Sequence, residues 1–317
     1  MKKLVPIKGD ASIRKFYRKK NNHNTSIIVF AKKEKFKNLL VYDAINKVLN
    51  KNKILAPKLY KESYKKNFLE IEDFGENTVF DLLKKRKSNK KKLYIKSINL
   101  LNKIQKIKNG KTKNFKGSNY KLLFYDSKKL SSEARLFLNW YAKKFISKNK
   151  FSKLNIKINK QIKFLLSNIK LRDKIFVHRD FHVSNLMIHK SQMAIIDSQD
   201  ALIGNKAYDL ASLIDDVRFK SNIGFKNDIY NYYLKSNKNY INEKNFLNDF
   251  QILSVLRNMK IIGIFTRLAM RDKKKEYLNL IPYAWKLIEL RMSENEKLNE
   301  LKVLLDNNFS KKIRNFK

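Results

Sequence analysis

The sequence contains no cysteine among its 317 residues. This absence excludes a disulfide framework, a thiolate nucleophile and a metal site built on cysteine ligands. Glycine and proline are also scarce, with seven and three residues, so each one is informative about turns. No apolar run reaches the roughly 20 residues that a membrane-spanning helix needs, and the basic start lacks the apolar stretch of a signal peptide. We therefore expect a soluble, cytoplasmic protein.

Acidic residues are few as well, because 28 Asp and Glu stand against 72 Lys and Arg, for a formal net charge of +44. Of the basic residues 12 are Arg and 60 are Lys, spread along the chain beside abundant Asn and Ile. Nucleic-acid-binding proteins tend to concentrate charge in a patch and to use Arg for bidentate contacts. The pattern therefore favours solvated lysine-rich surfaces. A basic nucleic-acid-associated protein stays an alternative, which steeply salt-dependent binding to DNA or RNA would support.

Hydrophobic residues make up 43% of the chain and aromatic residues 12%, which is typical of a globular protein. In the N-terminal part, apolar runs predict strands around residues 15–18 and 26–31, and apolar spacing of three and four predicts a helix over 36–50. Another strand is expected after Pro57, and the alternation over 67–75 predicts one more, which ends at a glycine turn.

After Gly75 the spacing of the apolar residues becomes that of a helix over residues 78–107. Further helices are expected near 131–148, near 157–170 and from 207 to the end. A basic loop with Gly110 and Gly117 interrupts them, as do three short strands, around 175–177, 186–188 and 193–197. We therefore expect an α+β protein with an N-terminal lobe at 1–75, which would bind a nucleotide, and a helical C-terminal lobe at 76–317.

Residues 178–185 read His-Arg-Asp-Phe-His-Val-Ser-Asn and lie between two predicted strands. Phosphoryl transfer needs a carboxylate beside the attacking hydroxyl and oxygen ligands for the Mg²⁺ that bridges the phosphates. Asp180 is placed to accept the proton of a substrate hydroxyl. A hairpin of the two following strands would bring Asn185 and Asp197 to one Mg²⁺ ion. This spacing predicts an ATP-dependent kinase.

Other interpretations of these residues exist. His178, Asp180 and His182 alternate like a zinc or iron site, but a chain with four His and no Cys has few further ligands to offer. In a kinase, His178 is expected to support the loop structurally. Asp209 lies at a predicted helix start, where it would either be a third metal ligand or, as we favour, a structural cap.

The motif His-x-Asp-x-His-x-x-Asn at 178–185, followed by the segment Ile196–Gly204 and by Tyr-Asp-Leu-Ala at 208–211, resembles the aminoglycoside phosphotransferase and choline kinase superfamily. More narrowly, the segments 9–14, 133–140 and 263–272 resemble the N-acetylmuramate/N-acetylglucosamine anomeric kinases of cell-wall recycling. The matches run from about residue 8 to 290. The resemblance implies a protein-kinase-like bilobal fold that forms one phosphotransferase domain.

The resemblance also implies residue roles, with Asp180 as catalytic base and Asn185 and Asp197 as Mg²⁺ ligands. The loop over the ATP phosphates would contain Gly9, Asp10, Ser12 and Arg14, and the backbone from Glu70 to Phe74, with Glu72 at its centre, would contact adenine.

Two positions depart from the pattern. Ser198 stands where these kinases usually have an aromatic residue, and no lysine lies clearly within the strand at 27–31, where many kinases anchor the phosphates. The substitutes available are Arg14, which we favour, Arg18, Lys32 and Lys33.

The excess of basic residues argues against a polycationic aminoglycoside as substrate. A carboxylate-bearing amino sugar would instead suit a bidentate arginine, and Arg267 and Arg271 lie in the matching block, although both would also serve to cap helices or pair with Glu133 and Asp272. Trp140 and Trp285 would stack on a sugar or belong to the core.

We therefore predict an ATP- and Mg²⁺-dependent phosphotransferase that acts on a sugar hydroxyl, here the anomeric one. Alternatives are a kinase of another small alcohol or of an aminoglycoside, and a pseudokinase that serves as an interaction module.

Overall fold

The computed structural model describes residues 3–7, 14–20, 24–31, 38–85, 88–107, 110–172 and 174–316. The chain divides into two compact units, one of residues 1–124 with 175–203 and the other of residues 125–174 with 204–317. The predicted catalytic segment and the N-terminal sheet therefore belong to the same unit. The lobe boundary expected after Gly75 stays a prediction.

Among the described residues, the first unit contains three α-helices and the β-strands, of which β11 ends one residue beyond the unit. Its helices are α1 (Asn38–Lys51), α2 (Val79–Lys84) and α3 (Lys90–Gln105). Its strands are β1 (Lys3–Ile7), β2 (Lys15–Lys20), β3 (Thr25–Phe30), β4 (Leu59–Ser63), β5 (Phe68–Glu72), β6 (Lys111–Lys113), β7 (Asn119–Lys121), β8 (Ile175–Val177), β9 (Leu186–His189), β10 (Gln192–Ile195) and β11 (Leu202–Gly204).

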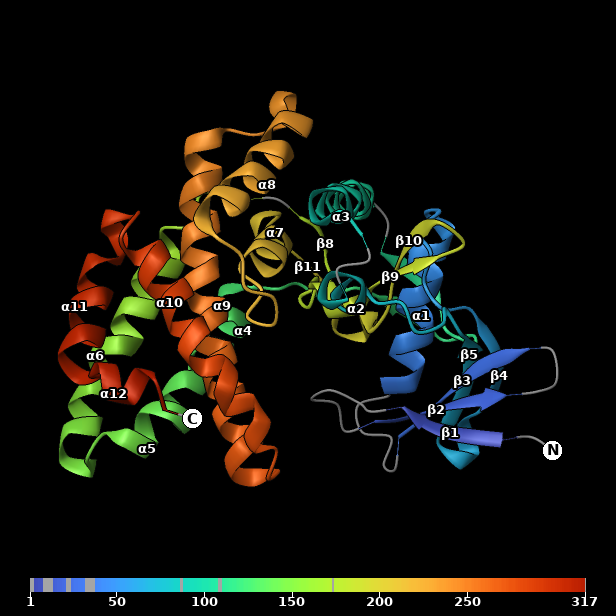
Figure 1. Ribbon diagram of the computed structural model, residues 1–317, viewed down its shortest axis with the longest axis horizontal. Coiled ribbons are helices and arrows are strands. Elements are labelled where there is room, and N and C mark those ends of the chain that lie inside the picture. The colour runs from blue at the N-terminus through green and yellow to red at the C-terminus, as the bar shows by residue number, and fades with distance from the viewer. Residues whose placement is uncertain are drawn as a thin grey trace. The chain divides into compact units, whose positions relative to one another are not determined.

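Five strands among the described residues form one antiparallel sheet, in the order β1-β2-β3-β5-β4 (Figure 1). Because side chains alternate along a strand, Leu69 and Ile71 of β5 point to the same face and are both buried. Helix α1 covers this face, where Leu39 and Tyr42 join Val29 of β3 in one hydrophobic cluster. The sheet and α1 thus share a core.

The hairpin of β9 and β10 is attached to the segment before β4 and to the segment after β5. Its strands pair with Ile195 opposite Leu186. The backbone N–H of Ile188 donates to the carbonyl of Asn77 at 3.2 Å, and that of Ile195 donates to the carbonyl of Leu55 at 2.9 Å. These bonds hold the two strands of the hairpin, of which β9 follows Asn185 and β10 precedes Asp197.

The second unit is helical in its described residues. Its helices are α4 (Ser127–Ala134), a π-helical segment (Phe137–Ala142), α5 (Lys143–Phe145), α6 (Lys148–Ser167), α7 (Ala207–Ile214), α8 (Ile223–Ser236), α9 (Glu243–Arg271), α10 (Ile281–Met292), α11 (Asn299–Asn308) and α12 (Lys311–Arg314).

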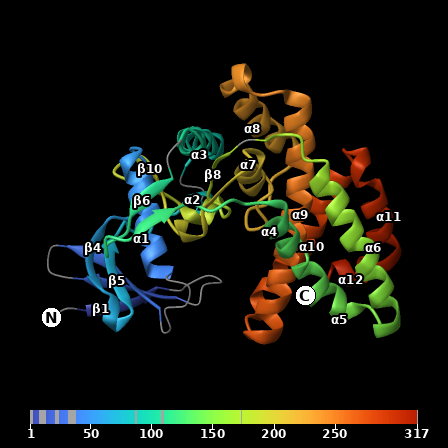
Figure 2. The same ribbon diagram turned by 180° about the vertical axis from the view of Figure 1, so that it is seen from behind.

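Helix α9 lies at the centre of this unit, with α10 packed along it and α6 beside α11 (Figure 2). Most of its side chains are buried. At Gly263 helix α9 packs so closely against the backbone of Leu136 that a Cβ atom at this position would lie 2.2 Å from the backbone carbon of Leu136. A glycine is therefore required in the middle of this helix.

An aromatic cluster lies around the π-helical segment and α10. Trp285 is 1% exposed, and its Nε1 donates to the hydroxyl of Tyr141 at 3.0 Å. Phe137 and Phe309 stand edge-on or tilted to it, with ring centroids 5.6 Å away. Trp285 therefore belongs to the core rather than to a sugar-stacking surface.

The α+β, protein-kinase-like class predicted from the sequence is confirmed by the antiparallel sheet and the helical remainder. Several local features were not predicted, among them the short strand β11. Strand β1 is present, the loop with Gly110 and Gly117 contains the short hairpin β6–β7, and α6 begins at Lys148 rather than near residue 157. In the described part of the chain, no helix is both long and apolar enough to cross a membrane.

Candidate active site

The loop between β8 and β9 holds the predicted catalytic residues in a tight backbone arrangement. Arg179 adopts a left-handed conformation, with φ at 73°, and its Nη1 donates to the carbonyl of Asp200 at 2.9 Å. The carbonyl of Asp180 accepts from the backbone N–H of His182 at 3.0 Å. Phe181 between them is fully buried. The buried Phe181 anchors the loop, and the half-buried Asp180 lies beside it.

Asn185 ends the 3₁₀ turn Val183–Asn185, which leads directly into β9. Its Nδ2 donates to the carbonyl of Asp180 at 3.0 Å, so the amide turns back over the loop. Its own carbonyl accepts from the backbone N–H of Ile196 at 3.0 Å. The hairpin therefore brings residue 185 next to the end of β10, as the spacing of the motif predicts.

Asp197 follows β10 in a left-handed conformation, with φ at 62° and ψ at 39°. A non-glycine residue adopts this conformation rarely, and strain of this kind concentrates at functional sites. Burial raises the pKa of Asp197, the charge of Arg14 opposes this rise, and the charges of Asp180 and Asp200 add to it. The carboxylates of Asp180 and Asp197 thus lie close enough to repel each other.

The oxygen donors of this loop fit a hard divalent cation. Mg²⁺ binds through one or two protein carboxylates and amide oxygens and keeps its other positions for water and phosphate. Asp197 supplies a carboxylate, and Asn185 has an amide oxygen available because its bond to Asp180 uses the nitrogen. Within the described ranges, no group of three or more His, Asp or Glu side chains is arranged to hold a metal ion. A carboxylate and an amide oxygen are ligands of the kind that Mg²⁺ takes, and the Mg²⁺ site stays a prediction.

Arg14 bridges the sheet to this loop. Its Nη2 lies 3.2 Å from Oδ1 of Asp197, and its side chain is nearly buried. The guanidinium also lies over the rings of Phe16 and Tyr42, at 6.0 and 5.9 Å from their centroids. A cation at this position neutralises a carboxylate that is 35% exposed and lies near the charges of Asp180 and Asp200.

Ser198 has a partner that explains its departure from the expected aromatic residue. Its hydroxyl is fully buried and donates to Oδ1 of Asn46 in α1 at 2.5 Å. Nδ2 of Asn46 donates in turn to the carbonyl of Pro57 at 3.0 Å. A polar pair replaces apolar packing here, and it joins α1 to the segment that positions Asp197.

The side chain of Arg18 in β2 makes its hydrogen bonds with the turn that follows β5. It donates to Asp73 at 2.6 Å, to the carbonyl of Gly75 at 2.9 Å and to Glu76. Burial acts to raise the pKa of Asp73, but the bonds from Arg18 and Gly75 outweigh it and lower that pKa below its usual range. Arg18 therefore braces the turn after β5, which leaves Arg14 as the described arginine beside the predicted phosphate site.

Comparison with known proteins identifies the family to which this chain belongs. The sequence profile of the phosphotransferase enzyme family matches residues 3–241. The chain belongs to this family. It is 25% identical over 307 residues to a protein of Pseudomonas aeruginosa named N-acetylmuramate/N-acetylglucosamine kinase, which covers 95% of this chain and 87% of the relative.

Solved structures show the same fold. A Plasmodium vivax ethanolamine kinase superposes with a TM-score of 0.61 at 15% identity, covering 92% of this chain and 82% of that one. The ADP-bound aminoglycoside phosphotransferase APH(2'')-Ib superposes with a TM-score of 0.57 at 16% identity, covering 90% and 92%. This chain is therefore a small-molecule phosphotransferase of the phosphotransferase enzyme family, and ATP is the nucleotide expected for it.

The remaining residues predicted for this phosphotransferase lie in several places. Gly9, Asp10 and Ser12 lie outside the described residues, as do Lys32 and Lys33. Glu72 is the last residue of β5, and its backbone N–H donates to the carbonyl of Lys58 at 2.8 Å.

Three further predicted residues belong to the helical unit. Asp209 is buried in the first turn of α7, where a carboxylate is favourable to the helix dipole. Arg267 is half-buried on α9, and burial lowers its pKa, as does the charge of Arg271. Arg271 ends α9, exposed, and bonds to Asp272 at 2.8 Å. Their roles stay predictions.

The sequence interpretation missed Tyr42 and Asn46 as residues that support the site. Both lie on the buried face of α1, so their apolar neighbours masked them as helix-core positions. Burial raises the pKa of Tyr42 to about 12, with the charge of Asp197 adding to this rise and that of Arg14 opposing it. A buried asparagine and tyrosine within an apolar helical stripe were the signal available.

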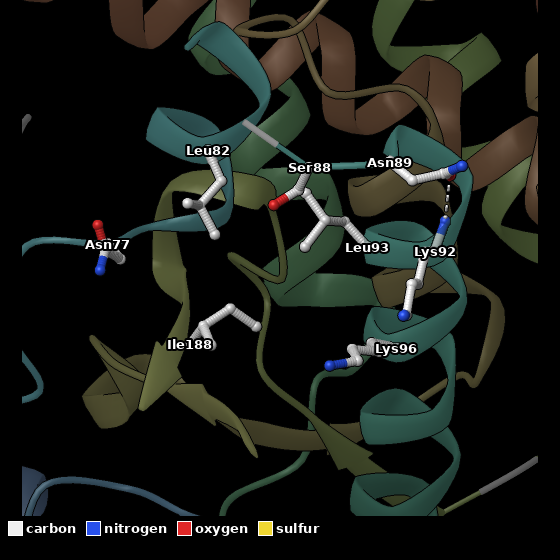
Figure 3. Close-up of a pocket in the computed structure, with 8 residues that line it drawn as sticks. All are labelled: Asn77, Leu82, Ser88, Asn89, Lys92, Leu93, Lys96 and Ile188. Atoms are coloured by element: carbon white, nitrogen blue, oxygen red, sulfur yellow. Dashed lines mark hydrogen bonds between the residues drawn. The ribbon is translucent and has the colours of Figure 1, made fainter. Parts of the chain in front are cut away.

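A cavity of about 450 Å³ lies elsewhere in the first unit, between α2, α3 and β9 (Figure 3). Leu82, Leu93 and Ile188 form its apolar part, and Lys92 and Lys96 line its α3 side. None of the predicted catalytic or metal-binding residues lines it. This cavity is therefore distinct from the candidate active site of the phosphotransferase.

His178 is fully buried at the start of the catalytic loop, where its Nε2 lies 3.1 Å from the carbonyl of Ile196. Burial lowers its pKa to about 4, although the charge of Asp180 opposes this shift. The ring is therefore neutral near pH 7, with the proton on Nε2 donated to the carbonyl. This geometry agrees with a structural role, and the histidine connects the loop to the end of β10.

The buried histidine predicts that the protein loses stability in mild acid. An unfolded His takes up a proton near pH 6.5, whereas folded His178 does so near pH 4. The unfolded state binds more protons between these values, so the free energy of unfolding falls as the pH drops through this window, by on the order of 3 kcal/mol. Urea unfolding of the wild type and of His178→Gln at pH 7.5 and pH 5 measures this effect. The wild type should lose more stability than the variant, and parallel losses would contradict the prediction.

Proposed function

We propose that this phosphotransferase transfers the terminal phosphoryl group of ATP to an amino sugar, at the anomeric hydroxyl of N-acetylmuramate or N-acetylglucosamine. The observation that supports this best is the convergence of Asp180, Asn185 and Asp197 on one loop and hairpin. The name of the relative from Pseudomonas aeruginosa supports the choice of sugar. The product would be a sugar 1-phosphate.

Asp180 acts in this proposal as the base that accepts the proton of the attacking hydroxyl. Asn185 and Asp197 would hold Mg²⁺, which neutralises charge on the phosphates when bound. Arg14 beside Asp197 adds a fixed positive charge at the same place. The rate would come from positioning the reactants and from a prearranged electrostatic environment, since phosphoryl transfer asks little covalent chemistry of the protein.

The nucleotide would be held by the first unit. We assign the phosphates to the loop with Gly9, Asp10, Ser12 and Arg14, and adenine to the backbone around Glu72. The bonds of Arg18 to Asp73 and Gly75 support this assignment, because they fix the turn that follows the proposed adenine-binding segment.

The sugar would be selected partly by charge. With 72 basic and 28 acidic residues, the protein attracts anionic substrates and repels polycations such as aminoglycosides. Arg267 and Arg271 are proposed to contribute to the binding of an acidic sugar. We assign the enzyme to the cytoplasm and to the recovery of cell-wall sugars.

The test is an ATP-consumption assay with N-acetylmuramate, N-acetylglucosamine, choline, homoserine, fructosamine and kanamycin as acceptors. Turnover is expected with the two N-acetylated sugars, and their reducing ends should disappear as the 1-phosphate forms. The methyl glycoside of N-acetylglucosamine is the matched control, because its anomeric hydroxyl is blocked. Turnover of the glycoside would reject the anomeric position, and turnover of kanamycin alone would reject the sugar assignment.

A further inference from the structure

The cavity between α2, α3 and β9 combines an apolar lining with positive charge. Its volume of about 450 Å³ falls in the range of roughly 300–1,000 Å³ that is usual for small-molecule sites. Its described lining residues are three apolar side chains, two lysines, two asparagines and one serine, and none of these is acidic. All of them belong to the first unit, so the cavity lies within one compact body.

The apolar part of the cavity comes from three different elements. Leu82 belongs to α2, Leu93 to α3 and Ile188 to β9. Leu93 is 5% exposed, whereas Leu82 and Ile188 are half-buried. Apolar side chains that face open space leave surface in contact with water, and covering that surface with an apolar group is favourable.

Two lysines of α3 bring positive charge to the same cavity. Lys92 and Lys96 are four positions apart, so their side chains are neighbours on one face of the helix. The ammonium group of neither lysine has a hydrogen-bond or ion-pair partner among the described residues. Helix α3 contains no Asp or Glu, and like charges at this spacing destabilise a helix. An anion between the two ammonium groups would remove this repulsion.

The polar groups face the apolar ones across the cavity. The ammonium group of Lys96 and the hydroxyl of Ser88 point from the α3 side toward Leu82 and Ile188 (Figure 3). Ser88 and Lys92 are exposed, so the cavity opens to solvent at its polar end. A molecule with an anionic head and an apolar body would therefore meet a matching surface at both ends.

One wall of the cavity is continuous with the catalytic hairpin. Ile188 follows Asn185 by three positions, and its backbone N–H donates to the carbonyl of Asn77, another lining residue, at 3.2 Å. Helix α2 contacts the turn Val183–Asn185, and α3 contacts β8 and β10. A ligand stabilises the conformation whose cavity it fits. Here that conformation includes the hairpin that brings Asn185 next to Ile196.

We propose that this cavity is an effector site, at which a small amphiphilic anion binds and tightens the binding of Mg²⁺-ATP. The anionic head lies between Lys92 and Lys96, and the apolar body lies against Leu82, Leu93 and Ile188. The coupling to Mg²⁺-ATP rests on the proposed function, in which Asn185 binds the metal. The binding of the anion does not rest on it.

The first experiment measures binding of octanoate to the full chain by calorimetry. Lys92→Gln and Lys96→Gln are compared with the wild type and with Lys103→Gln, which removes an exposed lysine of the same helix that does not line the cavity. Gln and Lys have similar helix propensities, so α3 should persist in all three variants. Each cavity variant should bind octanoate about fivefold to tenfold more weakly, and the control should stay within about twofold of the wild type.

A series of probes tests the apolar part of the site without changing the protein. From acetate through butanoate to octanoate, each methylene that becomes buried should tighten binding about threefold to fourfold. Octan-1-ol, which has the chain without the charge, should bind more weakly than octanoate. Acetate that binds as well as octanoate would overturn the proposal. An equal loss of octanoate binding in Lys96→Gln and Lys103→Gln would do so too, because it would show a general attraction to a basic surface.

The second experiment measures the affinity for ATP in the presence of Mg²⁺, with and without saturating octanoate. Octanoate should tighten nucleotide binding to the wild type about fivefold or more, and Mg²⁺-ATP should tighten octanoate binding by the same factor. The double variant Lys92→Gln/Lys96→Gln should lose this effect. An affinity for ATP that octanoate leaves unchanged or weakens would overturn the effector role.

The anion site and the proposed function can fail separately. If octanoate binding depends on Lys92 and Lys96 while ATP binding shows no dependence on Mg²⁺, the anion site stands and the assignment of Asn185 and Asp197 to the metal fails.

Discussion

Asp180→Ala is expected to lower kcat by about 10²- to 10⁴-fold, the range for loss of a positioned general base. The residue lies on the loop whose backbone is held by Phe181, His182 and Asn185, so the substitution should leave this loop in place. The affinity for ATP should change little, because Asp180 is assigned to the acceptor hydroxyl and not to the nucleotide. Steady-state kinetics and nucleotide binding by calorimetry measure the two quantities separately.

The matched control for Asp180→Ala is Asp200→Asn. Asp200 is a carboxylate of the same region, more exposed than Asp180, and it contributes its backbone carbonyl to Arg179. The substitution keeps that carbonyl and removes a charge of the same sign, so kcat should stay within about tenfold of the wild type. Near-normal turnover of Asp180→Ala would reject the general-base role.

Asp197→Ala should abolish the dependence of nucleotide binding on Mg²⁺ and lower turnover by at least about 10²- to 10³-fold, as expected when a group that stabilises transition-state charge is removed. It leaves Arg14 without the carboxylate 3.2 Å away. Free ATP should therefore bind the variant about as well as the wild type or better, whereas the gain that the wild type shows on adding Mg²⁺ should disappear. Calorimetric titration of ATP with and without Mg²⁺ measures this difference.

The two variants separate the proposed roles. Asp180→Ala should fail in the chemical step with magnesium-dependent binding intact, and Asp197→Ala should fail in both. An unchanged Mg²⁺ dependence in Asp197→Ala would show that another residue binds the metal. Asp200→Asn again serves as the control, since it also removes a negative charge that acts on Asp197.

The catalytic hairpin could be predicted from the sequence because its turn and its strand pairing are local. The turn from Asp180 to Asn185 and the pairing of β9 with β10 involve residues within about 20 positions of one another. Strand alternation and the short turn between the strands then fix which ends meet. The α+β class followed from the same reasoning, because apolar residues recur with a different spacing in the strand-rich N-terminal part than in the long helical part.

The partners of the site could not be predicted because they are distant in the chain. Arg14 lies 183 positions from Asp197, and Asn46 lies 152 positions from Ser198. Arg14 was favoured over Arg18 as a phosphate anchor, but the sequence did not show that the first pairs with the proposed metal ligand and that the second braces the turn after β5. Which cation faces which carboxylate depends on how α1 and the sheet pack.

The arginines of helix α9 that were predicted to bind the sugar show the same limit, because their exposure and their partners could not be predicted from the sequence. The sequence drew attention to Arg267 and Arg271 through a matching block, and Arg271 proved to be exposed and bonded to Asp272.

The sequence by itself determined the fold class, the absence of cysteine chemistry and the order of the carboxylate and amide residues along the catalytic hairpin. These depend on residue type, on period and on short spacings, which act locally. The tertiary structure alone decided which charges are buried, which of them are paired and which face the others. Burial and charge compensation depend on segments that are far apart in the chain and meet only in the folded protein.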